Sequence, residues 1–166
     1  MLEKLKQALE EALDDEYKAR ATYQLVLQKF GQIRPFVNIL QSEERHIQAL
    51  FSLFQKYQIP IPIDTWKDRV EMPNSVLSAC EAGVQAEIEN GEMYERLLAM
   101  TEEYPDVQRV FWNLQWASQQ NHLQAFQRCV QRLGLRSTRG LEIPIRGRRG
   151  RKQHRGGRGC RRQHCC

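Results

Sequence analysis

Apolar side chains recur every three or four positions along most of this 166-residue chain. This spacing places them on one face of an α-helix. Gly31 ends the first such stretch, Pro35 lies in the first turn of the second, and Gly134 is the expected C-cap of the last. The pattern predicts an all-α protein with four long helices and almost no β-structure. The predicted helices cover residues 2–30, about 35–57, about 75–103 and about 106–133.

The connections between these helices predict their arrangement. About four residues join the first and second helices and about two join the third and fourth, so each pair must form an antiparallel hairpin. The connection over residues 58–73 begins with Ile59-Pro60-Ile61-Pro62-Ile63, which cannot be helical. About 16 extended residues reach about 50 Å, whereas the second helix is about 35 Å long. The sequence therefore predicts a four-helix bundle in which a long crossover joins two antiparallel hairpins and places the third helix parallel to the second.

Charge divides the chain into two parts. Residues 1–135 contain 14 of the 25 Lys and Arg residues and 19 of the 20 Asp and Glu residues, so their net charge is about −5. Residues 136–166 contain 11 basic residues and one acidic residue, so their net charge is about +10. We predict a helical bundle over residues 1–135 and a disordered Arg/Gly-rich tail over residues 136–166. The tail is either a segment that binds nucleic acid or another polyanion, or a solvated extension without a role of its own.

The sequence shows no sign of export or membrane insertion. No window approaches the roughly 18–20 consecutive apolar residues of a membrane span, and the N-terminus, Met1-Leu2-Glu3-Lys4, lacks the apolar core of a signal peptide. Three of the five Cys residues fall within the last seven positions, which does not fit a secreted disulfide framework. These features favour a cytoplasmic protein with no membrane partner.

Two histidines lie in the predicted bundle, and each follows a polar residue by three positions. Glu43 precedes His46, and Gln119 precedes His122. An i, i+3 spacing puts both side chains of a pair on one helix face. A carboxylate or amide oxygen and an imidazole nitrogen placed in this way can bind one metal ion together.

The first and third helices carry a matching signal. Glu16 is followed seven residues later by Tyr23, and Glu87 is followed seven residues later by Tyr94. Seven residues make two turns, so each Glu shares a face with its Tyr. The two tyrosines are either ordinary core residues or hydroxyl groups that support the ligands.

Positions along the bundle test whether these residues meet. Counted from the turn of each hairpin, the polar candidates lie at one level to within about one helical turn, or about 5 Å. Oxygen and nitrogen donors suit iron and manganese, and burying several carboxylates without cations would be very costly. The sequence therefore predicts a buried metal centre. Its expected metal ligands are Glu16, Glu43, His46, Glu87, Gln119 and His122, with Tyr23 and Tyr94 beside them.

Three motifs in this order resemble the ferritin-like superfamily, most closely its rubrerythrin-like branch. They are Glu16-Tyr17-Lys18-Ala19-Arg20-Ala21-Thr22-Tyr23, Ser42-Glu43-Glu44-Arg45-His46, and the stretch from Ala79 to Asn90. The last is similar to an uncharacterised bacterial and archaeal ferritin-like family. The resemblance covers about residues 3–134 and implies a ferritin-like bundle with a di-iron carboxylate site that reacts with oxygen or peroxide.

The chain departs from the motifs of the family it resembles at two positions. Gln119 stands where the family has Glu, which predicts a weakened second metal position. Asn90 stands where rubrerythrins tend to have a further carboxylate. The chain also lacks a rubredoxin-like pair of Cys-x-x-Cys motifs, so the sequence shows no built-in electron donor, and an external donor is one possibility.

The expected function is therefore that of a metal-binding protein with two Fe ions, or one Fe with Mn or Zn. It would oxidise Fe(II) or reduce peroxide or oxygen, as a ferroxidase or a peroxidase-type oxidoreductase. Two alternatives remain. One is a non-enzymatic bundle whose basic tail binds nucleic acid or another polyanion; the other is an iron store, which needs a large oligomer rather than a monomer or homodimer.

Two further groups of residues have alternative interpretations. Cys80 and Cys129 lie equally far from the second turn, on antiparallel neighbours, so the sulfur atoms can touch as two thiols or as a redox-responsive disulfide. Phe111, Trp112 and Trp116 are interpreted as a packing stripe on the fourth helix rather than a cofactor site.

Overall fold

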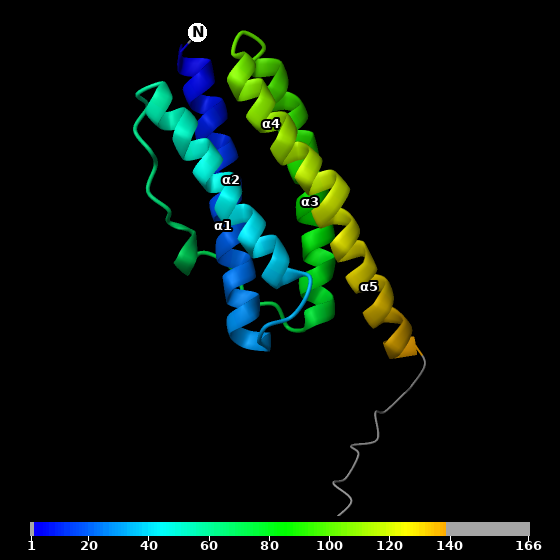
Figure 1. The fold of residues 1–166 in the computed structure, drawn as a ribbon. Coiled ribbons are helices and arrows are strands. Elements are labelled where there is room, and N and C mark those ends of the chain that lie inside the picture. Colours follow the sequence, from blue (N-terminus) through cyan, green and yellow to red (C-terminus); the bar gives the residue numbers. More distant parts are fainter. Residues whose placement is uncertain (1, 139–166) are drawn as a thin grey trace, which may run out of the picture.

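A computed structural model describes residues 2–138, with side chains placed as far as residue 135. Within these residues the chain is helical and contains no strand (Figure 1). Four long helical segments pack side by side, and the last of them is interrupted by a π-helical turn. The elements are α1 (Leu2–Phe30), α2 (Phe36–Lys56), the short 3₁₀-helix η1 (Trp66–Asp68), α3 (Val76–Met100), α4 (Pro105–Ala117), the π-helix η2 (Ser118–His122) and α5 (Leu123–Thr138).

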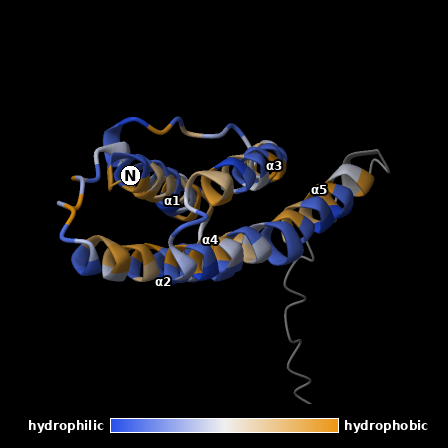
Figure 2. Ribbon diagram, turned by 90° about the horizontal axis from the view of Figure 1, so that it is seen from above, coloured by the Kyte–Doolittle hydropathy of each residue, from blue (hydrophilic) through white to orange (hydrophobic). Residues whose placement is uncertain are grey.

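The helices form two antiparallel pairs. Figure 1 shows α1 running down and α2 running up, and then α3 running up and α4, η2 and α5 running down. Helices α2 and α3 therefore run in the same direction, as the length of their connection predicts. Viewed from above, α1 and α3 form one layer, α2 and α4–α5 form the other, and much of the apolar surface lies between the two layers (Figure 2).

Local sequence explains where the helices begin and end. Gly31 ends α1 with a φ of +80°, a conformation that glycine adopts without a steric penalty. Ser75 caps α3 in a reciprocal capping box with Ser78. Gly134, however, does not end the last helix: α5 continues to Thr138, and Leu133 beside it packs against the apolar core. Residues 136–138 therefore belong to the helix and not to the predicted tail.

The crossover between α2 and α3 is attached along α1. Arg20 of α1 forms an ion pair with Asp64 at 2.6 Å, and the indole Nε1 of Trp66 donates to Asp14 at 2.8 Å. Further along, Lys29 donates to the main-chain oxygen of Pro73 at 2.7 Å. These contacts hold the crossover on the outer side of α1, where it leaves the bundle interior to the four helices.

The core has two apolar clusters along its length. One contains Leu9, Leu50 and Leu97; the other contains Phe126 and a disulfide between Cys80 and Cys129. Of the two interpretations of that cysteine pair, the structure has the bonded one. Between the two clusters lies a layer of buried polar side chains, to which α1, α2, α3 and η2 contribute.

The predicted aromatic packing stripe on α4 is wrong in part. Phe111 is fully buried, but Trp112 is 56% exposed and Trp116 is 50% exposed. The two tryptophans are four residues apart and so share one helix face, and that face is turned toward solvent.

No helix within residues 2–138 combines the length and apolar character needed to cross a membrane. The predictions of a disordered basic tail and of polyanion binding fall on residues 139–166. Those residues lie outside the described part of the chain, so both remain predictions.

Candidate metal centre

All four helical segments contribute donor groups to the polar layer between the two apolar clusters. Glu16 comes from α1, Glu43 and His46 from α2, Glu87 from α3 and His122 from η2. The side chains of the three Glu residues and of His122 are at most 6% exposed, and that of His46 is 12% exposed. The structure therefore brings together five of the six side chains that the sequence predicts as ligands.

Glu43 lies between the two imidazoles. Its Oε2 is 2.8 Å from Nδ1 of His46, and its Oε1 is 3.3 Å from Nδ1 of His122. One carboxylate oxygen of Glu43 and one ring nitrogen from each of His46 and His122 lie within 4.8 Å of one another, close enough to surround an ion.

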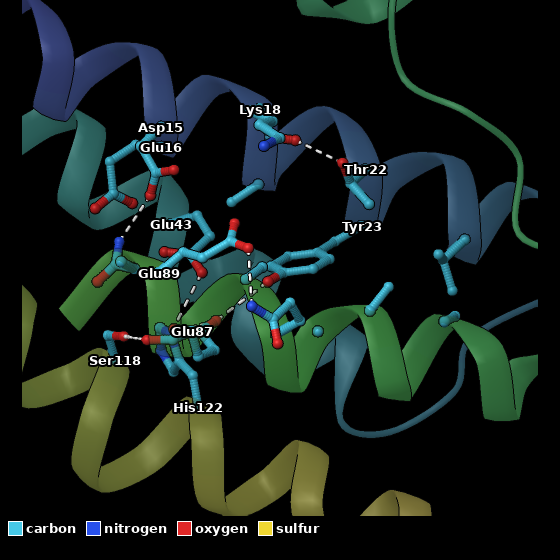
Figure 3. Close-up of a pocket in the computed structure, with 18 of the residues that line it drawn as sticks. Asp15, Glu16, Lys18, Thr22, Tyr23, Glu43, Glu87, Glu89, Ser118 and His122 are labelled. Atoms are coloured by element: carbon cyan, nitrogen blue, oxygen red, sulfur yellow. Dashed lines mark hydrogen bonds and ion pairs between the residues drawn. The ribbon is translucent and has the colours of Figure 1, made fainter. Parts of the chain in front are cut away.

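The remaining two carboxylates lie on either side of Glu43. Glu16 Oε2 is 3.2 Å from Nδ1 of His46, and Glu87 Oε1 is 3.6 Å from Nδ1 of His122. Two sets of three donors result, and they share Glu43. Figure 3 shows Glu16, Glu43, Glu87 and His122 converging from different helices.

Each of the two tyrosines forms a hydrogen bond with a candidate ligand on the other helix. Tyr23 of α1 donates its hydroxyl hydrogen to Glu87 Oε1 of α3 at 3.1 Å. Tyr94 of α3 donates to Glu16 Oε1 of α1 at 3.0 Å. Both rings are buried, so each hydroxyl fixes the orientation of one candidate ligand. The sequence predicts a Tyr beside each Glu of its own helix, but the structure pairs each Tyr with the Glu of the other.

Burial and neighbouring charges shift the pKa values of three groups at the centre. Burial, together with the carboxylates of Glu16 and Glu87, raises the pKa of Glu43 well above its usual value. Burial acts to lower the pKa of His46, but hydrogen bonds to Glu16 and Glu43 outweigh it and raise that pKa to about 10. Burial also acts to raise the pKa of Glu16, but its hydrogen bonds, first of all to His46, bring the net shift below the usual value. Cations that replace these protons would relieve the repulsion between the carboxylates.

Gln119 is not among the donors that the structure brings together. Its Nε2 donates to the main-chain oxygen of Glu87 at 2.5 Å, and its amide packs so closely on Gly91 that a Cβ there would lie 2.5 Å from Nε2. The reason is the π-helix, in which the N–H of Leu123 bonds to the oxygen of Ser118, five residues earlier. The extra residue in this turn brings Ser118 rather than Gln119 onto the buried face with His122.

We expect Gln119→Glu to add no metal and to destabilise the protein by about 1–2 kcal/mol. The new carboxylate has no N–H group to donate to the main-chain oxygen of Glu87, and it would face that oxygen instead. Chemical denaturation and metal analysis of the purified variant measure both effects. Gln120→Glu, at the next and exposed position, is the matched control and should change neither. A gain of about one bound iron per chain in Gln119→Glu would instead show that residue 119 faces the centre.

Sequence reasoning misses one acidic residue of this layer. Asp15 lines the cavity beside Glu16, and burial raises its pKa to about 6. Its Oδ2 accepts a hydrogen bond of 2.7 Å from Nδ2 of Asn90, whose own Oδ1 is buried without a hydrogen-bond partner. Neighbours along a helix usually face different directions, so the position next to Glu16 carries no periodic signal for Asp15. The i, i+3 spacing from Glu87 to Asn90 is the signal that links Asn90 to the site.

A cavity of about 320 Å³ leads to the centre between α1 and α3. Glu16, Glu43 and Glu87 line it together with both histidines. Small side chains of α3, such as Ala82 and Ala86, also line it. Figure 3 shows Lys18, Thr22 and Glu89 around the same space. This volume is at the lower end of small-molecule sites, and it admits ions, water and small oxidants to the donors.

Comparison with known proteins gives a family and a solved relative. The chain is 29% identical over 147 residues to the uncharacterized protein MJ0754 of Methanocaldococcus jannaschii, covering 80% of this chain and 78% of that protein. The crystal structure of hypothetical protein MJ0754 from Methanococcus jannaschii has a TM-score of 0.69 and 28% identity, over 78% of this chain and 81% of that chain. A family model described as "Uncharacterized protein domain (DUF2202)" matches residues 11–140, which include all the donors above. The chain therefore belongs to the DUF2202 family.

Proposed function

We propose that this protein is a ferritin-like metal-binding protein whose centre holds two iron ions, or one iron with manganese or zinc, and oxidises Fe(II) or reduces peroxide. The observation that carries the proposal is the position of Glu43, a buried carboxylate with one oxygen toward each of two histidines. On either side, Glu16 and Glu87 complete two sets of donors around it.

The donor chemistry fits iron or manganese. Carboxylate oxygens and imidazole nitrogens suit these ions, and a soft thiolate set is absent from the centre. Three buried carboxylates this close together repel one another, and cations bound between them relieve that repulsion. The resemblance of the Glu-x6-Tyr and Glu-x-x-His motifs to rubrerythrin-like proteins supports the same assignment.

Each part of the site would have its own role. Glu16 with His46 would hold one ion, Glu87 with His122 would hold the other, and Glu43 would bridge them. Bound iron would supply the redox chemistry with oxygen or peroxide at open coordination positions. Tyr23 would keep Glu87 oriented, and Tyr94 would keep Glu16 oriented. Loss of a residue that hydrogen-bonds to a metal ligand commonly lowers metal affinity about 10- to 100-fold.

The cavity is the proposed access route. Outside the five donor side chains, its lining has three acidic residues, Asp15, Glu71 and Glu89, and one Lys, Lys18, which favours the approach of a cation. The same route accommodates peroxide or oxygen. The proposal therefore needs no large movement of the bundle for access to the centre.

Anaerobic titration with Fe(II), followed by one addition of hydrogen peroxide or oxygen, tests the proposal. We expect about two iron ions bound per chain and their oxidation on mixing, followed by absorbance and by Mössbauer spectroscopy. A metal content below about 0.2 iron or manganese per chain, with no anaerobic uptake, would refute it. Sedimentation in the same samples separates an iron-storing oligomer from a monomer or homodimer.

A further inference from the structure

The disulfide joins α3, which carries Glu87, to α5, which begins directly after His122. Cys80 of α3 and Cys129 of α5 have their Cα atoms 6.1 Å apart, and both side chains are at most 1% exposed. Cys80 precedes Glu87 by seven residues, and Cys129 follows His122 by seven. Because α3 and α5 are antiparallel, both cysteines lie on the same side of the centre, two turns or about 10 Å along the bundle.

Packed side chains fill the space between the cysteines and the centre. Phe126 lies against Gly83, where a Cβ would come within 2.8 Å of the ring. The Tyr23 ring is 5.6 Å from the Phe126 ring, centroid to centroid, and its hydroxyl donates to Glu87. Tyr23, Phe126 and both cysteines belong to one buried cluster. The cysteines are therefore connected to Glu87 through a continuous set of packed side chains.

We propose that Cys80 and Cys129 are the internal electron donor for peroxide reduction at the centre, an inference that rests on the proposed function. The dithiol form loses two electrons and two protons as the S–S bond forms. One hydrogen peroxide gains them as its O–O bond breaks, and two water molecules result. The sulfurs are oxidised, the peroxide oxygens are reduced, and the two thiol protons end in the water.

Burial of the sulfurs makes this route specific. A thiol reacts directly with peroxide or with an external disulfide only when it is accessible, and neither sulfur is. Oxidation of this pair should therefore depend on the donors two turns away. A disulfide with only a mechanical role, which stabilises the fold by linking positions 49 residues apart, would not show this dependence.

The test counts thiols, and it uses the full chain with Cys160, Cys165 and Cys166 changed to Ser. The protein is reduced with a phosphine in denaturant, refolded anaerobically, checked for native helicity by circular dichroism, and loaded with Fe(II). After the addition of hydrogen peroxide, acid quenching, alkylation and mass spectrometry give the state of Cys80 and Cys129. We expect both thiols to be lost at least about 100-fold faster in the loaded chain than in the metal-free chain.

Stoichiometry provides a second measurement that does not depend on rates. The dithiol can give up two electrons, and the pair of ferrous ions can give up two more. Since each peroxide takes two electrons, the reduced, loaded chain should consume roughly two equivalents of peroxide without an added reductant. Cys129→Ala, which cannot form the disulfide and keeps the small buried volume, should consume roughly one.

The outcomes separate the two proposals. If iron binds and peroxide is consumed while both thiols persist, the electron-donor proposal is overturned and the proposed function stands. Equal thiol oxidation with and without iron also overturns it, because the centre then has no part in the reaction. If the chain takes up no iron, both proposals fail.

Discussion

Glu43→Gln is expected to lower the affinity for iron by more than about 100-fold and to leave the purified chain almost metal-free. Mutating a residue that only hydrogen-bonds to a metal ligand already lowers metal affinity about 10- to 100-fold, and Glu43 is a proposed ligand itself. Glu43 contacts both histidines and lies between Glu16 and Glu87, so it is the one carboxylate common to both donor sets. An amide has only one oxygen with which to coordinate and carries no charge. Both proposed positions should therefore be lost together, whereas Glu16→Gln should mainly weaken the position at His46.

Folding of the metal-free variant separates a lost ligand from a lost structure. The raised pKa of Glu43 favours the neutral carboxyl in the metal-free protein, and a glutamine amide has nearly the same shape. The melting temperature without metal should therefore change by less than about 3 °C, which corresponds to roughly 1 kcal/mol in a chain of this size. Glu44→Gln is the matched control, since its side chain is the exposed neighbour, and it should retain full iron content. Normal iron binding by Glu43→Gln would contradict the bridging role.

Metal is expected to stabilise the protein increasingly as pH rises. His46 has a pKa of about 10 in the folded, metal-free chain and an unperturbed value of 6.5. The stability from its protonated form is complete below about pH 6.5 and is lost as pH rises toward 10, at about 1.4 kcal/mol per pH unit. The raised pKa of Glu43 acts in the same direction. At a pH above the pKa that this carboxyl has in the unfolded chain, unfolding releases a proton that the folded chain holds, so stability falls as pH rises. The metal-free chain should therefore lose stability from pH 6.5 upward.

Bound ions replace these protons, so the metal-loaded chain should keep its stability over the same range. A free ion concentration of about 1,000 times Kd adds about 4 kcal/mol per site, or on the order of 10 °C in melting temperature. Calorimetry with Mn(II) or with a chelator, at pH 6, 7 and 8.5, measures the difference between the two states. A difference that does not change with pH would mean that His46 and Glu43 are not the groups that the metal deprotonates.

Much of the fold and of the site can be read from the helical repeat. Period and turn residues place the helices to within a few residues, and the short and long connections predict the two hairpins and the crossover. The same repeat places Glu16, Glu43 and Glu87 on inward faces, because positions along one helix have a set angular relation. Their common level follows from counting residues away from each turn.

Contacts between helices are less accessible to this reasoning. The crossed hydrogen bonds of Tyr23 and Tyr94 depend on how far α1 and α3 are rotated and shifted against each other, and no spacing within one helix specifies that. The central place of Glu43 depends in the same way on the approach of His122 from the opposite layer.

The sequence by itself determined an all-helical chain with its carboxylates and histidines at one level. Only the tertiary structure decided which of them meet. A single π-helical turn, favoured by nothing visible in Ser118-Gln119-Gln120-Asn121-His122, replaces Gln119 with Ser118 on the buried face. One extra residue in a turn shifts every following side chain around the helix, and the packing of all four segments, not local propensity, selects it.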